Sequence, residues 1–233
     1  MTLQEHLAEL RRRLIICVVC FCAASAVCFV VYPHILDFLK APYCHVTGPS
    51  RCVLYVTAPL DGLSLRVKLA AYGGLFFSFP VILWELWRFI TPGLNRNEKR
   101  YAVPFMSASI VLFAGGVAIA YLVFAHALKF LGSVGGPTLR QIYNPDSYLS
   151  LMVALMMVFG LTFEFPVILV SLELAGAVTP AKLASWRRWA IVLIVLFAAI
   201  ITPSGDPFSM LALAVPLYFF YEASIVLGKL LRR

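Results

Sequence analysis

The chain has 233 residues and a formal net charge of +8; 62% of its residues are hydrophobic and only 13% are charged. This composition, with a mean hydropathy of +0.91, excludes an ordinary soluble domain and indicates a protein that crosses a membrane several times. Loops at a membrane surface explain the basic charge, so no nucleic-acid partner is expected.

Residues 1 to 13 predict a short amphipathic helix on the membrane surface. Thr2 and Glu5 fit the spacing of a capping box, and leucines recur along one stripe. The other face carries Glu9 and Arg13, whose spacing favours an ion pair with each other. A basic start before an apolar run also resembles a cleaved signal peptide. The run is longer than a signal core, so we expect a first span instead.

Six apolar runs predict an all-α protein with six transmembrane helices in a single domain of residues 1–233. The expected spans cover about residues 14–32, 66–87, 101–128, 147–174, 189–203 and 207–227. The last two runs are short against roughly 30 Å of hydrocarbon, which predicts a thinned bilayer beside them. An even number of spans places both termini on the same side.

The distribution of basic residues predicts that this side is the cytoplasm. Most of the 19 Lys and Arg residues lie near the termini or in two loops, near residues 88–100 and 175–188. The loop from Pro33 to about Gly62 is then the main external segment. Oxidation is possible there, so Cys44 and Cys52 could form a disulfide or remain free thiols.

The fourth apolar run contains a single carboxylate, Glu164, two residues before Pro166. An ionisable group at mid-bilayer costs about 2.5 to 3.5 kcal/mol or more, so it is usually kept by a function or held by a partner. Glu164 is therefore the first functional candidate. Glu173 and Glu222 lie nearer the cytoplasmic interface, where we expect both to be solvated.

The sequence contains no motif of a common enzyme class. It lacks a nucleophile elbow, an H-E-x-x-H helix and a phosphate-binding Gly-Lys-Ser/Thr loop, and its four histidines are scattered. A metal ion bound at His6 and Glu9 would have only these two candidate protein ligands. We therefore expect neither an enzyme nor a cofactor, and the remaining chemistry is recognition by charge.

Three separated segments carry a family resemblance. They read HLAELRRRL at 6–14, FPVILWELWRFITPGLNRNEKR at 79–100 and FGLTFEFPV at 159–167. Together they resemble the TatC family, the multispanning receptors of the twin-arginine protein translocase. The resemblance implies a cup-shaped, six-helix protein of the cytoplasmic membrane that binds the twin-arginine signal peptides of folded proteins. It also implies TatA- and TatB-like single-span partners, a homo-oligomeric receptor complex and transport driven by the proton-motive force.

The resemblance also implies roles for individual residues. The residues expected to bind the signal peptide are Glu9, Phe89, Leu94 and Glu98, and the family's intramembrane glutamate corresponds to Glu164. Charge supports this independently, because a carboxylate can accept a guanidinium through two parallel hydrogen bonds.

Partner contact is expected at Glu164, Thr202 and Met210, although the chain departs from the family pattern near the last two. The segment of residues 202–210 looks one residue longer than usual, and Met210 stands where Gln is common. Glu85 also replaces a more usual Gln.

The alternative function is a secondary transporter that uses Glu164 as a proton or ion carrier. No internal repeat is evident among the six runs, which disfavours it.

Overall fold

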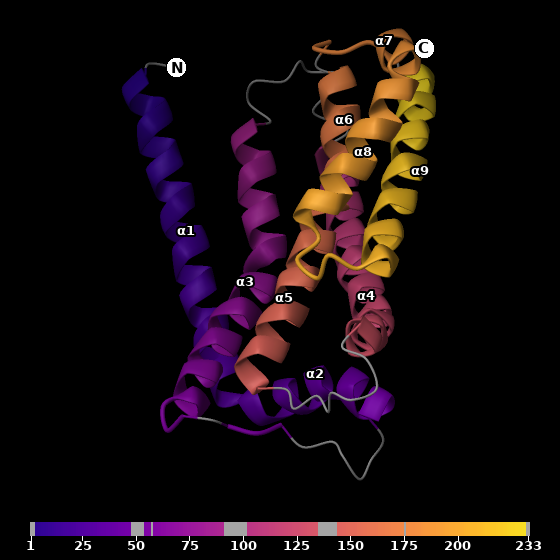
Figure 1. Cartoon of the computed structure of the whole chain (residues 1–233). Coiled ribbons are helices and arrows are strands. Elements are labelled where there is room, and N and C mark those ends of the chain that lie inside the picture. Colours follow the sequence, from indigo (N-terminus) through magenta and orange to yellow (C-terminus); the bar gives the residue numbers. More distant parts are fainter. Residues whose placement is uncertain are drawn as a thin grey trace. The chain divides into compact units, whose positions relative to one another are not determined.

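The computed structural model describes residues 3–47, 54–56, 58–90, 102–134, 144–174 and 176–231. All regular secondary structure in these ranges is helical, as predicted (Figure 1). In chain order the helices are α1 (Leu3–Val30), α2 (Tyr32–Thr47), α3 (Asp61–Ile90), α4 (Ala102–Val134), α5 (Pro145–Thr162), α6 (Phe165–Leu174), α7 (Pro180–Ser185), α8 (Arg187–Ile201) and α9 (Pro207–Leu231).

Five segments of the described chain are long and apolar enough to cross a membrane, which confirms the polytopic class. They are Leu7–Val30, Asp61–Arg88, Val103–Val134, Pro145–Leu174 and Pro207–Leu230. The other expected span corresponds to α8, whose 15 residues extend only about 22 Å. This helix is short, as the sequence predicts.

The expectation that the last span is also short is wrong. Helix α9 has 25 residues, about 37 Å of helix, and continues well past Tyr221, where the uncharged run ends. Glu222 does not end it, because its carboxylate pairs with Arg187 of α8 at 2.7 Å. A charge compensated in this way is tolerated inside a helix near the membrane interface.

The chain divides into two compact units. Unit 1 comprises Met1–Lys40, Tyr55–Ile110 and Asn144–Asp146, and unit 2 comprises Ala41–Leu54, Val111–Tyr143 and Ser147–Arg233.

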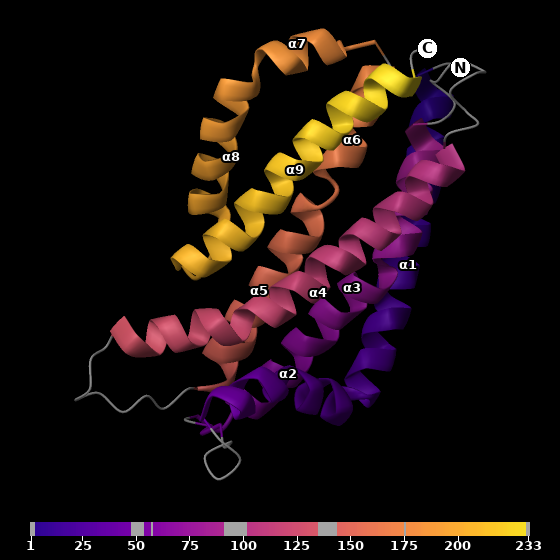
Figure 2. The same ribbon diagram turned by 90° about the vertical axis from the view of Figure 1, so that its right-hand side faces the viewer.

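Unit 1 is built on α1 and α3, which run antiparallel and side by side (Figures 1 and 2). Their close approach requires glycine, because a Cβ at Gly74 would collide with Ser25 of α1. Toward the end of α1, Arg66 donates to the carbonyl oxygen of Phe29 at 3.0 Å. The separate surface helix expected at residues 1–13 is instead the first part of α1. No Pro or Gly interrupts the sequence from Leu3 to Val30, so nothing breaks the helix there.

The segment from Pro33, expected to be an external loop, forms most of the 16-residue helix α2 instead. Its prolines suggested irregular structure. Pro33 lies in the first turn, however, where the missing N–H is not needed for an intrahelical hydrogen bond. Helix α2 also buries Leu39 and Tyr43, and such burial overrides weak local propensity.

In unit 2, α4 packs against α5 around large buried side chains. Phe124, Met152 and Phe159 are fully buried, and the rings of Phe124 and Tyr148 meet edge to face with centroids 5.4 Å apart. Gly116 allows the contact between the helices, because a Cβ there would lie 2.6 Å from the backbone oxygen of Phe159.

The span expected at residues 147–174 is interrupted between α5 and α6 (Figure 2). Pro166 cannot donate a backbone hydrogen bond, and its ring clashes with the carbonyl four residues earlier in a regular helix. The chain restarts after Glu164, whose carbonyl oxygen accepts from the N–H groups of Val167 and Ile168 at 3.1 Å each. The break therefore places Glu164 at the junction of the two helices.

Candidate functional site

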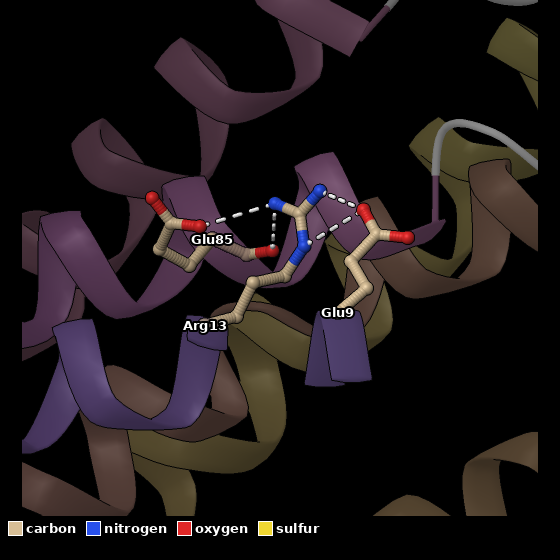
Figure 3. Close-up of polar contacts among 3 residues, drawn as sticks. All are labelled: Glu9, Arg13 and Glu85. Carbon is tan, nitrogen blue, oxygen red and sulfur yellow. Dashed lines mark hydrogen bonds and ion pairs between the residues drawn. The ribbon is translucent and has the colours of Figure 1, made fainter. Parts of the chain in front are cut away.

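A half-buried arginine held between two carboxylates joins α1 to α3 within unit 1. Arg13 of α1 donates from Nε to Oε1 of Glu9 at 3.2 Å, and its Nη2 also pairs with that oxygen. On its other side, Nη1 donates to Oε2 of Glu85 at 3.1 Å and to the Glu85 backbone oxygen at 3.5 Å. Figure 3 shows the guanidinium held between the two acids. We call these three residues the Arg13 cluster.

The members of the Arg13 cluster differ in exposure. The side chain of Glu85 is 9% exposed and that of Arg13 is 13% exposed, whereas that of Glu9 is 26% exposed. Two carboxylates share the guanidinium, and Glu9 is the most accessible of the three side chains.

The pairing expected between Glu9 and Arg13 is confirmed, but its extension to Glu85 was not foreseen. Seventy-two positions separate Arg13 from Glu85, so helical spacing could not reveal the contact. The signal available in the sequence was Glu85 itself, an acid in a strongly apolar segment.

The other expected signal-binding residues follow Glu85 along the chain. Phe89 lies in the last turn of α3, four residues after Glu85 and therefore one helical turn away; its side chain lies outside the described structure. Leu94 and Glu98 also lie outside the described residues.

The expected intramembrane site lies in unit 2. The side chain of Glu164 sits at the junction of α5 and α6, and the residue is only 8% exposed. Thr202 is also buried and is the C-cap of α8; its hydroxyl donates to the carbonyl oxygen of Ala198 at 2.5 Å. Met210 is half-buried in the first turn of α9.

The turn before α9 contains a buried acid that sequence reasoning missed. Asp206 accepts at Oδ1 from the backbone N–H of Ser209 at 2.8 Å. It thereby satisfies a donor at the helix start as an N-cap residue. The signal was present, because Asp before Pro207 is a standard helix-start pattern.

The expectation of a solvated Glu173 is wrong, since this residue is 0% exposed. Its carboxylate lies against Gly228 of α9, where any Cβ would overlap it. The glycine leaves room for the acid between α6 and α9. Glu222, by contrast, is half-buried and paired with Arg187.

The external cysteines can be followed only in part. Cys44 is disulfide-bonded, and Cys52 lies outside the described residues. The cysteines of α1 are free thiols.

An apolar hollow of about 620 Å³ lies in unit 2 and is lined by residues of α5, α6, α7, α8 and α9. Its walls include Phe165, Trp189, Phe197 and Leu217, and Lys182 is the charged residue that lines it. No carboxylate belongs to these walls. The hollow therefore suits hydrocarbon better than an ion path.

Comparisons with known proteins agree on one family. The family model described as "Sec-independent protein translocase protein (TatC)" matches residues 5–216. A protein of that description from Frankia casuarinae is 43% identical over 98% of this chain, which spans 65% of that longer protein. Another from Aquifex aeolicus is 38% identical, with 100% of this chain and 97% of the relative covered.

A solved structure is similar as well. The "Crystal Structure of Twin Arginine Translocase Receptor- TatC" superposes with a TM-score of 0.79 at 38% identity, covering 98% of this chain and 100% of that one. The similarity therefore extends over both units of the chain.

Proposed function

This chain belongs to the TatC family of Sec-independent protein translocase proteins, and we propose that it is the signal-peptide receptor of a twin-arginine translocase. The observation that carries this proposal is the full-length similarity to a solved receptor of that name. The chain is a multi-pass protein of the cytoplasmic membrane. No enzymatic step is part of the proposed role.

The proposed receptor crosses the membrane six times, with α8 as the additional span and both termini in the cytoplasm. A helix of 15 residues can do this where the bilayer is thinned and flanking basic residues reach the interface. Arg187 and Arg188 stand at the start of α8 and fit this requirement. The cup shape implied by the family belongs to the same proposal.

The two arginines of the signal are proposed to bind Glu9 and Glu98, while Phe89 and Leu94 pack against the residues that follow them. Carboxylates suit this role because a planar guanidinium forms two parallel hydrogen bonds with one acid. The partial exposure of the Glu9 side chain supports the assignment. Most basic residues lie on the same side, so long-range attraction is not expected to contribute.

Single-span TatA- and TatB-like proteins and further copies of this chain are the proposed partners within the bilayer. Glu164, Thr202 and Met210 are the proposed contacts for a partner helix or an inserted signal. Polar groups at this depth gain most when another helix supplies a hydrogen bond. Transport of folded cargo would be driven by the proton-motive force.

The test is the affinity of the purified protein, in detergent or nanodiscs, for a synthetic twin-arginine signal peptide. Glu9→Ala and Glu98→Ala should each weaken binding, because each removes a charge-assisted acceptor whose loss costs about 1.5 to 3 kcal/mol. The double variant should bind most weakly.

A peptide with both arginines replaced by lysine is the matched control and should also bind poorly, because ammonium groups lack the forked geometry. Unchanged affinity in a folded Glu98→Ala protein would contradict the receptor assignment.

A further inference from the structure

We propose that the apolar hollow of unit 2 is a binding site for one anionic phospholipid of the cytoplasmic leaflet. The phosphate of this lipid lies at Lys182 of α7, and one of its acyl chains runs along α8. The inference goes beyond the proposed function and takes from it only the placement of α7 on the cytoplasmic side of the membrane.

The hollow exists because two of the helices that line it do not pack against each other. Helices α6 and α8 each pack along α9, and in the described chain they hardly meet directly. Figure 2 shows α8 standing apart from α5 and α6. The side chains that face this space enclose about 620 Å³, which lies within the usual range of ligand sites.

The wall formed by α8 suits an extended acyl chain. Its lining residues recur at helical spacing from Trp186 to Ile201, so they occupy one face of the helix. The 15 residues of α8 extend about 22 Å, more than the roughly 15 Å of hydrocarbon in one leaflet. A chain of the cytoplasmic leaflet can therefore lie along this face over its whole depth.

Charge is found at the α7 end of the hollow. Lys182 lines that end and is exposed, and its Nζ lies 5.3 Å from the centroid of the Trp186 ring. No carboxylate of the described chain forms an ion pair with Lys182, whereas the neighbouring Arg187 is paired with Glu222. Lys182 is therefore the cation that can receive a phosphate at this end.

An anionic phospholipid matches both ends of the hollow. Basic pockets between transmembrane helices on the cytoplasmic side attract the head groups of anionic lipids. Trp186 and Trp189 are exposed beside Lys182, and tryptophan favours the level of the head groups. A free phosphate would leave the apolar walls uncovered, whereas the chain of a lipid covers them.

The experiment measures the quenching of the hollow's tryptophans by brominated lipids in the purified full-length protein. Trp84 and Trp87 of α3 do not line the hollow and are replaced by Phe, which leaves Trp186 and Trp189 as the fluorescent pair. The protein in detergent micelles is titrated with phosphatidylglycerol or phosphatidylcholine that carries the same brominated chains. Half-maximal quenching should need about fivefold less phosphatidylglycerol, the preference expected from one lysine near a head group.

Lys182→Gln should reduce this preference to within about twofold, because the attraction to the phosphate is lost. Lys229→Gln is the matched control, since Lys229 is exposed in the last turn of α9 but does not line the hollow. Both variants remove one positive charge from unit 2, so they differ only in its position. A preference that survives in Lys182→Gln, or that Lys229→Gln reduces equally, would overturn the inference.

Ala190→Phe tests where the acyl chain lies. Ala190 belongs to the α8 wall, and a ring there takes up part of the space for the chain. The variant should need more of either lipid for half-maximal quenching, and an unchanged requirement would place the chain outside the hollow and overturn the inference. Thermal unfolding without added lipid checks that each variant is folded.

The twin-arginine signal peptide supplies the last comparison. Lipid quenching should persist when the peptide is saturating; its loss would make the apolar segment of the peptide the occupant and overturn the lipid site. Glu98→Ala separates the two proposals. If the lipid preference fails while Glu98→Ala still weakens peptide binding, only the lipid site is wrong. If Glu98→Ala leaves peptide binding unchanged while Lys182→Gln removes the lipid preference, only the receptor assignment fails.

Discussion

Glu164 shows how one residue can shape both a helix and a candidate site. Its backbone oxygen accepts the first N–H groups of α6, and its carboxyl group is buried at the helix junction. The backbone role is independent of the side chain. Substitutions at Glu164 should therefore leave the break in place and report on the carboxyl group alone.

At the residue scale, we predict that Glu164→Ala binds the signal peptide but transports cargo poorly. The residue lies within a membrane span, in a different unit from Glu9. Glu164→Gln should retain more transport, because it keeps the size and the carbonyl acceptor while avoiding the cost of a buried charge.

Export of a twin-arginine cargo in cells that lack their own receptor, measured beside peptide affinity, tests this prediction. Equal loss of transport in both variants would show that the carboxylate must titrate. That outcome would favour the proton-carrier alternative.

Helix α4 contains two adjacent glycines with opposite environments, and the pair tests how closely the helices of unit 2 pack. A Cβ at Gly116 would meet the backbone oxygen of Phe159 of α5 at 2.6 Å, whereas a Cβ at Gly115 would have nothing within 4 Å. A backbone atom in the middle of a helix cannot move aside as a side chain can. The two positions therefore differ in packing but not in local sequence.

At the element scale, we predict that Gly116→Ala destabilises the protein by about 1 to 3 kcal/mol, the usual range for overpacking. Gly115→Ala should be neutral or gain up to about 1 kcal/mol, because alanine favours a helix over glycine. Thermal unfolding in detergent micelles measures both. A Gly116→Ala protein as stable as the wild type would mean that α4 and α5 do not pack this closely.

For the whole molecule, the number and direction of spans decide which face meets the signal. A reporter fused after Arg233 and one inserted near Arg96 should both be cytoplasmic, and one inserted near Gly48 should be external. The six proposed spans and the distribution of basic residues predict this pattern. Paired reporters that are active only on one side of the membrane measure it. An external C-terminus would mean that α8 does not cross the bilayer.

The sequence by itself determined the membrane class, the approximate place of five candidate spans, the position of Glu164 within one of them and the family, because these depend on local composition and motifs. A run of apolar residues is long enough to cross a bilayer whatever its neighbours are. The short α8 and the pairing of Glu9 with Arg13 are likewise local features. The spans of this chain are apolar on most faces, however, so their periodicity does not show which face packs against which helix.

Tertiary structure decided the features that depend on a distant partner. Burial turned the proline-containing segment after Tyr32 into α2, and Gly228 of α9 made a closed site for Glu173. The contact between Arg13 and Glu85 joins the first half of α1 to the last two turns of α3. Each of these outcomes follows from the close packing of two segments that are far apart in sequence. The room left by small side chains and the charged groups on one segment determine which side chains of the other can be buried.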